Sequence, residues 1–435
     1  MHSTSRISRA ALVVAVAVAL VAAVAVTVAA QAPAPARVVA IADVHGAFAE
    51  LVTLLQRTAL VDGNRHWVGG PATLVQTGDL LDRGPRSREC LDLVMDLERQ
   101  AAKAGGRLVP LLGNHEAMMV MGDLRYVTPE IFRTFATAQS HKVREKAYRD
   151  YTRFLAAHAA HGHAVAPDAD GTTRKKWMDE HPLGFFEYRD AFGPDGKYGR
   201  WIRGHHAIVQ IGGGLFVHGG LNPALEFRSV AELDARVGVE LQDFDRIWKA
   251  LARKKVVWRH MTLVEAVKHV GDELKRKQAQ ARPADPAVVR DMEALLGYRQ
   301  WLAASSNGPL WYRGLAQDPE EKLTAGLNAM LARLAARYVV VGHTITPNAT
   351  ITPRFASHVF AIDTGMLTQD SKGRASALEI RDGRFTAFYG DGAPQAVDPP
   401  ALARPPLVNV PVMSWATGRA PAGAHRGPKS LGFSR

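Results

Sequence analysis

Short apolar runs alternate with segments of helical periodicity over most of this chain. Val38–Ile41, Thr73–Val75 and Leu108–Leu112 are brief apolar runs that end in polar or glycine-containing turns, which predicts buried strands. Apolar positions at helical spacing follow the first two runs, for example through Leu51 and Leu54. Strands that alternate with helices in this way are typical of an α/β domain.

The second half of the chain contains further strand patterns. His206–Ile211 and Leu215–Val217 predict a hairpin that turns at Gly212–Gly214, and Tyr338–Val341 predicts a later strand. The three glycines resemble a phosphate-binding loop, but no helical pattern follows them, so a turn is the better interpretation.

Two segments, at about 128–177 and 229–302, break the alternation and are helical throughout. Ser229 and Glu232 form a capping-box pattern at the start of the second segment. We interpret both segments as helical insertions into the α/β frame. Two roles remain open for them, namely packing against the sheet or forming a lid that shapes substrate access.

The N-terminal segment, residues 1–30, has the pattern of a signal peptide or a membrane anchor. Arg6 and Arg9 precede an uninterrupted apolar run from Ala10 to Ala30. Because positive residues stay on the cytoplasmic side, both interpretations place the following domain outside the cytoplasm. We therefore expect a periplasmic, secreted or membrane-anchored protein, with residues 31–36 as a linker.

Composition and charge indicate a globular enzyme-sized domain over residues 37–398. Hydrophobic residues make up 47% of the chain and charged residues 22%. Seven of the twelve net positive charges lie at the two ends, five of them in residues 399–435, a basic Pro/Ala-rich segment that we expect to be poorly ordered. The rest is only mildly basic, so no nucleic-acid partner is expected. Cys90 falls on an apolar helical face and is expected in the core.

Five polar clusters follow the ends of apolar runs. They are Asp43-Val44-His45-Gly46, Gly78-Asp79-Leu80-Leu81-Asp82-Arg83-Gly84, Gly113-Asn114-His115-Glu116, His218-Gly219-Gly220 and Gly342-His343-Thr344. If the runs are neighbouring strands, the clusters meet at one edge of the sheets, where α/β proteins place their ligands. Carboxylate, amide and imidazole groups without sulfur suit manganese, iron or zinc, and their number fits a pair of divalent ions.

The order of these clusters resembles the calcineurin-like metallophosphoesterases, and among them the phosphoprotein phosphatases. Gly308–Gly314 and Val341–Thr344 are most similar to the bacterial-type Shewanella-like protein phosphatases, and the resemblance spans Val38 to Phe388. It implies two packed mixed β-sheets flanked by helices. One departure is Ala42, which stands where the family usually has glycine, so that its methyl group could shift the loop carrying Asp43.

The resemblance also implies a role for each candidate residue. Asp43 and His45 would bind the first metal ion, and Asp79 would bridge the two ions. The second ion would be bound by Asn114, His218 and His343. His115 would be the general acid, and Asp82 would fix its tautomer. Arg83 and Arg313, with Asn114, would bind the substrate phosphate, a task that suits the guanidinium fork. The alternative for both arginines is a surface or interdomain ion pair.

We therefore expect a metal-dependent phosphoesterase. The expected reaction is hydrolysis of phosphate monoesters by a metal-bridging hydroxide, with phosphorylated proteins (Ser/Thr or Tyr) or small phosphomonoesters as substrates. One alternative is a nucleotide or dinucleoside-polyphosphate hydrolase, because Gly78–Pro85 also resembles that branch. Another is a non-catalytic binding module tethered to the membrane.

Overall fold

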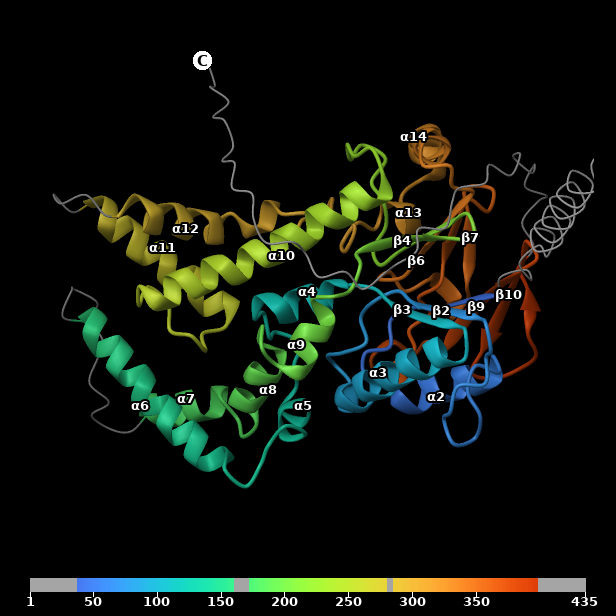
Figure 1. The fold of residues 1–435 in the computed structure, drawn as a ribbon. Coiled ribbons are helices and arrows are strands. Elements are labelled where there is room, and N and C mark those ends of the chain that lie inside the picture. The colour runs from blue at the N-terminus through green and yellow to red at the C-terminus, as the bar shows by residue number, and fades with distance from the viewer. Residues whose placement is uncertain (1–36, 160–171, 280–284, 398–435) are drawn as a thin grey trace, which may run out of the picture. The chain divides into compact units, whose positions relative to one another are not determined.

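The structure, a computed structural model, describes residues 37–159, 172–279 and 285–397 (Figure 1). The predicted signal or anchor (1–30), the linker (31–36) and the basic segment (399–435) lie outside these residues and stay predictions. Among the described helices none is both long enough and apolar enough to cross a membrane.

Two mixed β-sheets form the frame of the fold, as the resemblance implied. The first has six strands in the order β11-β10-β9-β1-β2-β3 and the second has five in the order β4-β5-β6-β8-β7. The strands of the first are β1 (Val38–Ile41), β2 (Thr73–Gln76), β3 (Arg107–Pro110), β9 (Ser376–Arg381), β10 (Arg384–Tyr389) and β11 (Gln395–Ala396). Those of the second are β4 (Ile208–Ile211), β5 (Gly214–Val217), β6 (Tyr338–Val341), β7 (Thr352–Arg354) and β8 (Val359–Ala361).

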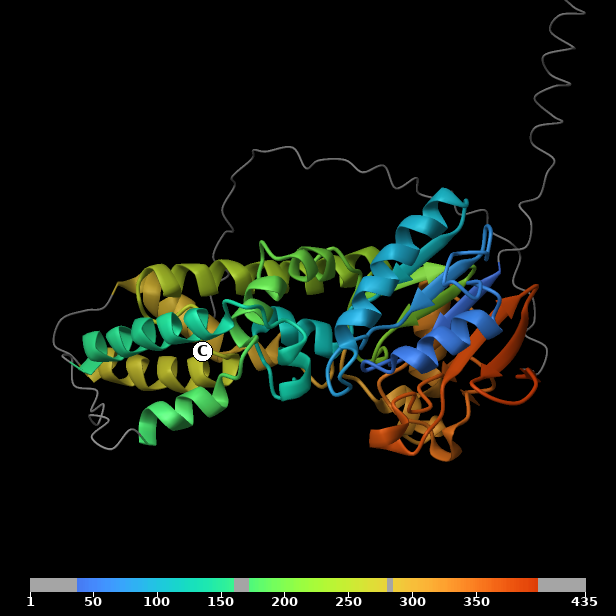
Figure 2. The same cartoon turned by 90° about the horizontal axis from the view of Figure 1, so that it is seen from below.

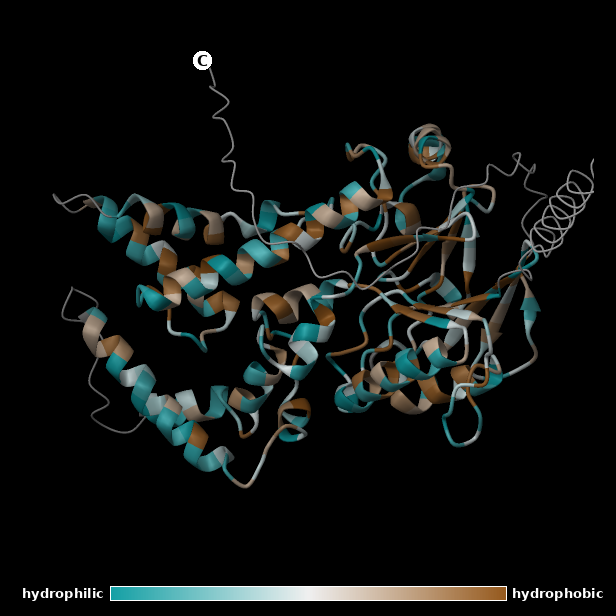
Figure 3. Ribbon diagram, in the orientation of Figure 1, coloured by the Kyte–Doolittle hydropathy of each residue, from teal (hydrophilic) through white to brown (hydrophobic). Residues whose placement is uncertain are grey.

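Both faces of the central strands are buried, which explains why they are continuous apolar runs rather than alternating ones. Val38 and Ala40 of β1 face the second sheet, where they join a core that includes Phe216 and Phe360. Ile41, on the other face of β1, belongs to the larger core beneath the helices. Figure 3 shows this composition as predominantly hydrophobic strands.

The described helices lie on the outer faces of the sheets and in the two insertions. They are α2 (Phe48–Arg57), α3 (Ser87–Lys103), α4 (Asn114–Met121), α5 (Pro129–Arg133), α6 (Ser140–Ala159), α7 (Thr172–Glu180), α8 (Phe185–Phe192), α9 (Lys197–Ile202), α10 (Val230–Arg253), α11 (Leu263–Ala279), α12 (Pro286–Leu296), α13 (Gly314–Gln317), α14 (Glu320–Arg333) and α15 (Thr368–Ser371), with 3-10 turns at Tyr298–Gln300 and Pro347–Ala349. Figure 2 shows α2 and α3 along one side of the six-stranded sheet.

Helices α10, α11 and α12 lie within 229–302, and helices α8 and α9 continue beyond Trp177, as far as Ile202. The predicted capping box is present at the start of α10, where the Ser229 hydroxyl accepts the Glu232 N–H at 3.1 Å. Both insertions meet at the end of α4, since Leu263 N donates to Gly122 O at 2.9 Å and the partly buried Arg189 packs against Gly122. The insertions are therefore joined to the helix that begins with Asn114 and His115.

The core between the sheets generates a stability prediction. Phe360 is fully buried there and stacks on Phe385 with ring centroids 4.3 Å apart. Phe360→Ala should lower the free energy of unfolding by about 3–5 kcal/mol, because it removes a buried ring and leaves a cavity. Urea denaturation measures this loss, and Val68→Ala, at a side chain 55% exposed, is the control with an expected change of about 0.5 kcal/mol or less. Equal stability of the two variants would contradict the packing.

Candidate metal and phosphate site

The predicted site residues converge at the carboxyl ends of parallel strands from both sheets. β1, β2 and β3 are parallel and lead to Asp43, Asp79 and Asn114, while β5 and β6 are parallel and lead to His218 and His343. Residues from opposite sheets are joined directly, since the backbone N–H of His343 donates to Asp43 Oδ1 at 2.8 Å. The arrangement confirms the expected meeting of these clusters at one edge.

Asp79 lies at the centre of two groups of side chains that could each hold a metal ion. One group is Asp79 with His45 and His115, and the other is Asp79 with His218 and His343. Asp79 Oδ2 lies 3.5 Å from His45 Nε2, 3.8 Å from His115 Nε2 and 3.3 Å from His218 Nε2. Asp79 therefore has the position expected of a bridge between two ions.

Backbone carbonyls fix the orientation of two of these imidazoles. Nδ1 of His45 lies 3.0 Å from Leu81 O, and Nδ1 of His218 lies 3.0 Å from Thr77 O. Each Nδ1 must carry the hydrogen to donate to its carbonyl, which directs Nε2 toward the carboxylates. Such a partner on the far nitrogen is the usual arrangement for a metal-binding histidine.

The second group fits a cation because its donor atoms face one another. His218 Nε2 lies 2.8 Å from Asn114 Oδ1 and 3.2 Å from His343 Nδ1. Ligand atoms about 2.0–2.2 Å from a common ion stand roughly 2.8–3.6 Å apart, a range that includes both separations. His343 Nδ1 faces His218, while its Nε2 is buried without a hydrogen-bond partner among the described residues.

The electrostatics of the site act differently on its imidazoles, lowering the pKa of two and raising the pKa of two. Burial lowers the pKa of His45 to about 3 and the pKa of His343 to about 2, so both rings keep a lone pair at neutral pH. Burial alone would also lower the pKa of His218, but the charges of Asp79 and Asp43 raise it to about 9. His218 thus carries a second proton, on Nε2, which a cation bound to that nitrogen would displace.

His115 and Asp82 form the expected pair. His115 Nδ1 lies 2.7 Å from Asp82 Oδ2, and both side chains are buried. Burial lowers the pKa of His115, but Asp79 and then Asp82 more than offset this, so the pKa lies above 6.5. The ring of Tyr126 covers His115 at 4.9 Å. With Nδ1 bonded to Asp82, Nε2 is the nitrogen that faces Asp79, at 3.8 Å from Oδ2.

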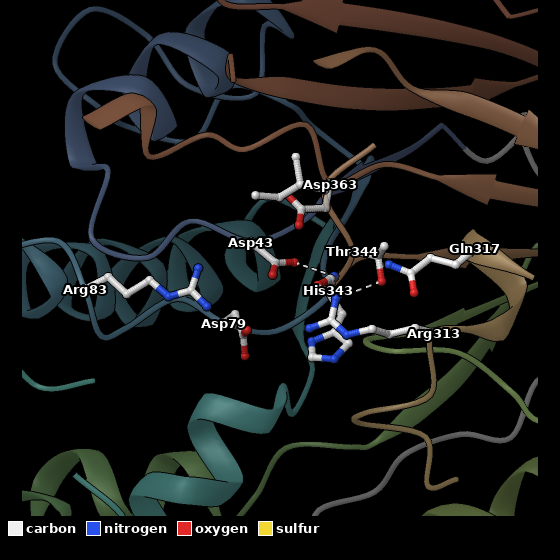
Figure 4. A pocket seen from close by; sticks show the side chains of 9 residues that line it. Asp43, Asp79, Arg83, Arg313, Gln317, His343, Thr344 and Asp363 are labelled. Carbon is white, nitrogen blue, oxygen red and sulfur yellow. Dashed lines mark hydrogen bonds between the residues drawn. The ribbon is translucent and has the colours of Figure 1, made fainter. Parts of the chain in front are cut away.

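A cavity of about 310 Å³ opens beside these groups, lined by Asp43, Asp79, Arg83, Arg313, Gln317, His343, Thr344, Ile345 and Asp363. Arg83 and Arg313 point into it from opposite sides (Figure 4). Arg313 Nη1 donates to His343 O at 2.6 Å and to Thr344 Oγ1 at 3.1 Å. Within the described residues neither arginine forms an ion pair, so the alternative role as a surface or interdomain ion pair has no support there. Both helical insertions are absent from this lining, as far as the described residues show.

The backbone of the site adopts conformations that side-chain-bearing residues rarely take. His45, Asp79, Asp82, Arg83 and His343 all have positive φ, between 48° and 69°. Residues held in the left-handed region cost free energy and cluster at functional sites. The glycines beside them relieve crowding: a Cβ at Gly342 would lie 2.7 Å from Asp43 Oδ1.

Ala42 does not displace the loop that carries Asp43. Its methyl group is buried in the core between the sheets, and Asp43 keeps its bond to His343. The departure from the family pattern at this position is therefore accommodated by packing.

The sequence patterns did not assign a role to Glu116, whose carboxylate holds together the loops that follow β2 and β3. Glu116 Oε2 accepts the N–H of Asp79 at 2.7 Å and of Gly113 at 2.9 Å, and Oε1 accepts the N–H of Leu80 at 2.9 Å. Burial raises its pKa to about 7. Its position in the Gly113–Glu116 cluster was the available signal.

Asp363 was also missed, together with the cavity residues Gln317 and Ile345, and Thr344 of the fifth cluster was given no role. Asp363 follows β8, is buried and lines the same cavity as Asp43. Burial, and next the charge of Asp363, raises the pKa of Asp43 well above its usual value. The available signal was an apolar run, Val359–Ile362, that ends in an aspartate as the first run ends in Asp43.

Comparison with known proteins agrees with this geometry. The family model described as calcineurin-like phosphoesterase matches residues 36–347. An uncharacterized protein of Schizosaccharomyces pombe is 27% identical over 343 residues, which cover 78% of this chain and 75% of that protein. Shewanella-like protein phosphatase 1 of Plasmodium berghei is 22% identical over 359 residues, which cover 81% of this chain and 73% of that protein.

Among solved structures, the cold-active protein-tyrosine phosphatase of a psychrophilic Shewanella species has a similar fold. The TM-score is 0.52 at 23% sequence identity, and the match covers 83% of this chain and 80% of that one. At this level of identity the likeness supports the two-sheet frame.

The role of Glu116 generates a prediction for Glu116→Gln. Glutamine has the same shape, but its amide group must face at least one of the three backbone N–H donors. A buried donor left without an acceptor costs about 1–3 kcal/mol. Urea denaturation of the metal-free protein should show this loss, whereas Glu130→Gln, at a side chain 53% exposed, should change stability by about 0.5 kcal/mol or less. A Glu116→Gln variant as stable as the parent would show that the carboxylate does not hold the loops.

Proposed function

The chain belongs to the calcineurin-like phosphoesterase family and is a metal-dependent phosphoesterase, and from this premise we propose that it hydrolyses phosphate monoesters, above all those of phosphorylated proteins. The observation that carries the proposal is the cavity in which Arg83 and Arg313 face the shared carboxylate Asp79. Two guanidinium groups beside two potential metal positions match a tetrahedral, doubly charged phosphate group.

Two divalent ions are the implied cofactor, with manganese, iron and zinc as candidates from the ligand types. We assign Asp43, His45 and Asp79 to the first ion, and Asp79, Asn114, His218 and His343 to the second. Such a pair supplies a nucleophile at neutral pH and neutralises charge that develops on the phosphate oxygens. The donor sets are buried, and carbonyls fix the tautomers of two of their imidazoles, His45 and His218, which supports this assignment.

The remaining side chains position the substrate and supply a proton. Arg83 and Arg313 approach the cavity from opposite sides, so they orient the phosphate between them. His115 carries a proton on Nε2 and donates it to the departing oxygen of the ester, while Asp82 accepts from Nδ1 and holds the ring in place. The substrate oxygen that leaves must therefore lie on the His115 side of the phosphate.

Protein substrates are supported by the relatives. The Plasmodium relative is named as a protein phosphatase and the Shewanella structure as a protein-tyrosine phosphatase. The cavity is formed at an exposed edge, with Arg313 and Ile345 both exposed, so a phosphorylated side chain of a larger molecule has access. Hydrolysis of nucleotides or dinucleoside polyphosphates is the competing substrate class, and a panel of both kinds distinguishes them.

We further propose that the enzyme acts outside the cytoplasm, either released or held by its N-terminal segment. The support is the pattern of residues 1–30, with two arginines ahead of a long apolar run. Fractionation of cells that produce the full chain tests this, and activity confined to the cytoplasm would contradict it.

The reaction class generates a prediction for Asp79→Asn. The full chain, stripped of metal by a chelator, should hydrolyse p-nitrophenyl phosphate only after manganese, iron or zinc is restored. Asp79→Asn should then reduce kcat/KM by about three orders of magnitude or more, because a single carboxylate serves both ions. Asp62→Asn, an exposed aspartate, is the control. Near-normal turnover by the Asp79 variant would refute the two-metal assignment.

The assigned role of His115 generates a second kinetic prediction. His115→Ala should slow the hydrolysis of phenyl phosphate by about 10²–10⁴-fold. It should slow the hydrolysis of p-nitrophenyl phosphate much less, because a good leaving group needs little help from a general acid. His66→Ala, at an exposed histidine, should leave both rates unchanged. Equal losses on the two substrates would exclude His115 as the proton donor.

A further inference from the structure

We propose that Asp363 is a further residue of the metal centre, whose negative charge strengthens binding of the ion held at Asp43. The inference deepens the proposed function and rests on it. Six parallel strands from the two sheets, β1, β2, β3, β5, β6 and β8, end at this edge. Five of them lead to a predicted ligand, and β8 leads to Asp363.

Strand register places Asp363 beside a predicted ligand. β6 and β8 are parallel neighbours in which Val341 pairs with Ala361. His343 and Asp363 each lie two residues beyond this pair, so they leave the sheet at the same level. The backbone on this side is tied together as well, since Thr346 N donates to Asp363 O at 2.9 Å.

The Asp363 carboxylate is buried in the same cavity as two other aspartates. Asp363 is 2% exposed and lines the cavity together with Asp43 and Asp79 (Figure 4). Within the described part of the chain no lysine or arginine forms an ion pair with any of these three aspartates. Buried carboxylates that share a site repel one another, and burying an unpaired charge is costly. A divalent cation at Asp43 converts this repulsion into attraction.

A structural role in the turn does not account for the charge. Asp363 Oδ1 accepts the N–H of Gly365 at 2.9 Å, an arrangement that asparagine makes equally well. Asp62 makes the same turn with the N–H of Asn64, also at 2.9 Å, but on the surface. The turn therefore accounts for one oxygen of Asp363 but does not account for the buried negative charge of its carboxylate.

Calorimetric titration of the metal-free full chain with manganese tests the proposal. Asp363→Asn keeps the turn and removes the charge, and it should weaken binding of one of the two ions by about 10–100-fold, as loss of a supporting carboxylate does at other metal sites. Asp62→Asn makes the identical change in the matching exposed turn and should bind manganese as the parent does. Unchanged affinity of Asp363→Asn for both ions would overturn the proposal.

Thermal melting separates this role from a purely structural one. Metal-free Asp363→Asn should melt at or above the melting temperature of the metal-free parent, because a buried repulsion is removed. Addition of manganese should raise the melting temperature of the variant by less than it raises that of the parent. A lower melting temperature without metal, with an undiminished gain from manganese, would mean that Asp363 only supports the turn. If the asparagine variant does not fold, Asp363→Ser, which retains a hydroxyl acceptor for Gly365, is titrated in its place with the same two outcomes. Failure of the proposed function looks different: a parent chain that binds two manganese ions but hydrolyses no phosphate monoester.

Discussion

The Asp79 carboxylate makes the contacts on which the rest of the site depends. Oδ2 lies within 3.8 Å of imidazoles that come from both sheets, and Oδ1 accepts the backbone N–H of His115 at 3.0 Å. Its own backbone is held in a left-handed conformation by the hydrogen bond to Glu116. Because these contacts reach β1, β3 and β5 at once, the loops after those strands have little freedom to move apart. The two sheets are thus joined at their edge by polar contacts as well as by the apolar core between them.

Much of this arrangement is readable in the sequence. A carboxylate, amide or imidazole after each of five apolar runs predicted that Asp43, Asp79, Asn114, His218 and His343 would meet, since parallel strands share one carboxyl edge. The division of the strands into two sheets was not readable in this way, because short fully buried strands carry no alternation to show which face meets which neighbour. That part of the prediction came from the resemblance to a family.

The features that were missed have physical reasons. Helices of the first insertion continue past Trp177 as short segments separated by Pro182, Gly184 and Gly196, which interrupt the periodic pattern. Glu116 acts on backbone N–H groups, so its partners could carry any side chain and leave no pattern in the sequence. Asp363 follows a strand of only three residues, Val359–Ala361, too short to be distinguished from a loop.

The hydrogen bond between Asp43 and His343 spans 300 positions of the chain. The donors assigned to the first ion all follow β1 and β2 of one sheet, whereas those assigned to the second ion come from both sheets. The second ion therefore lacks its full donor set until both sheets have folded together. Completion of the fold itself thus determines when that ion can be retained.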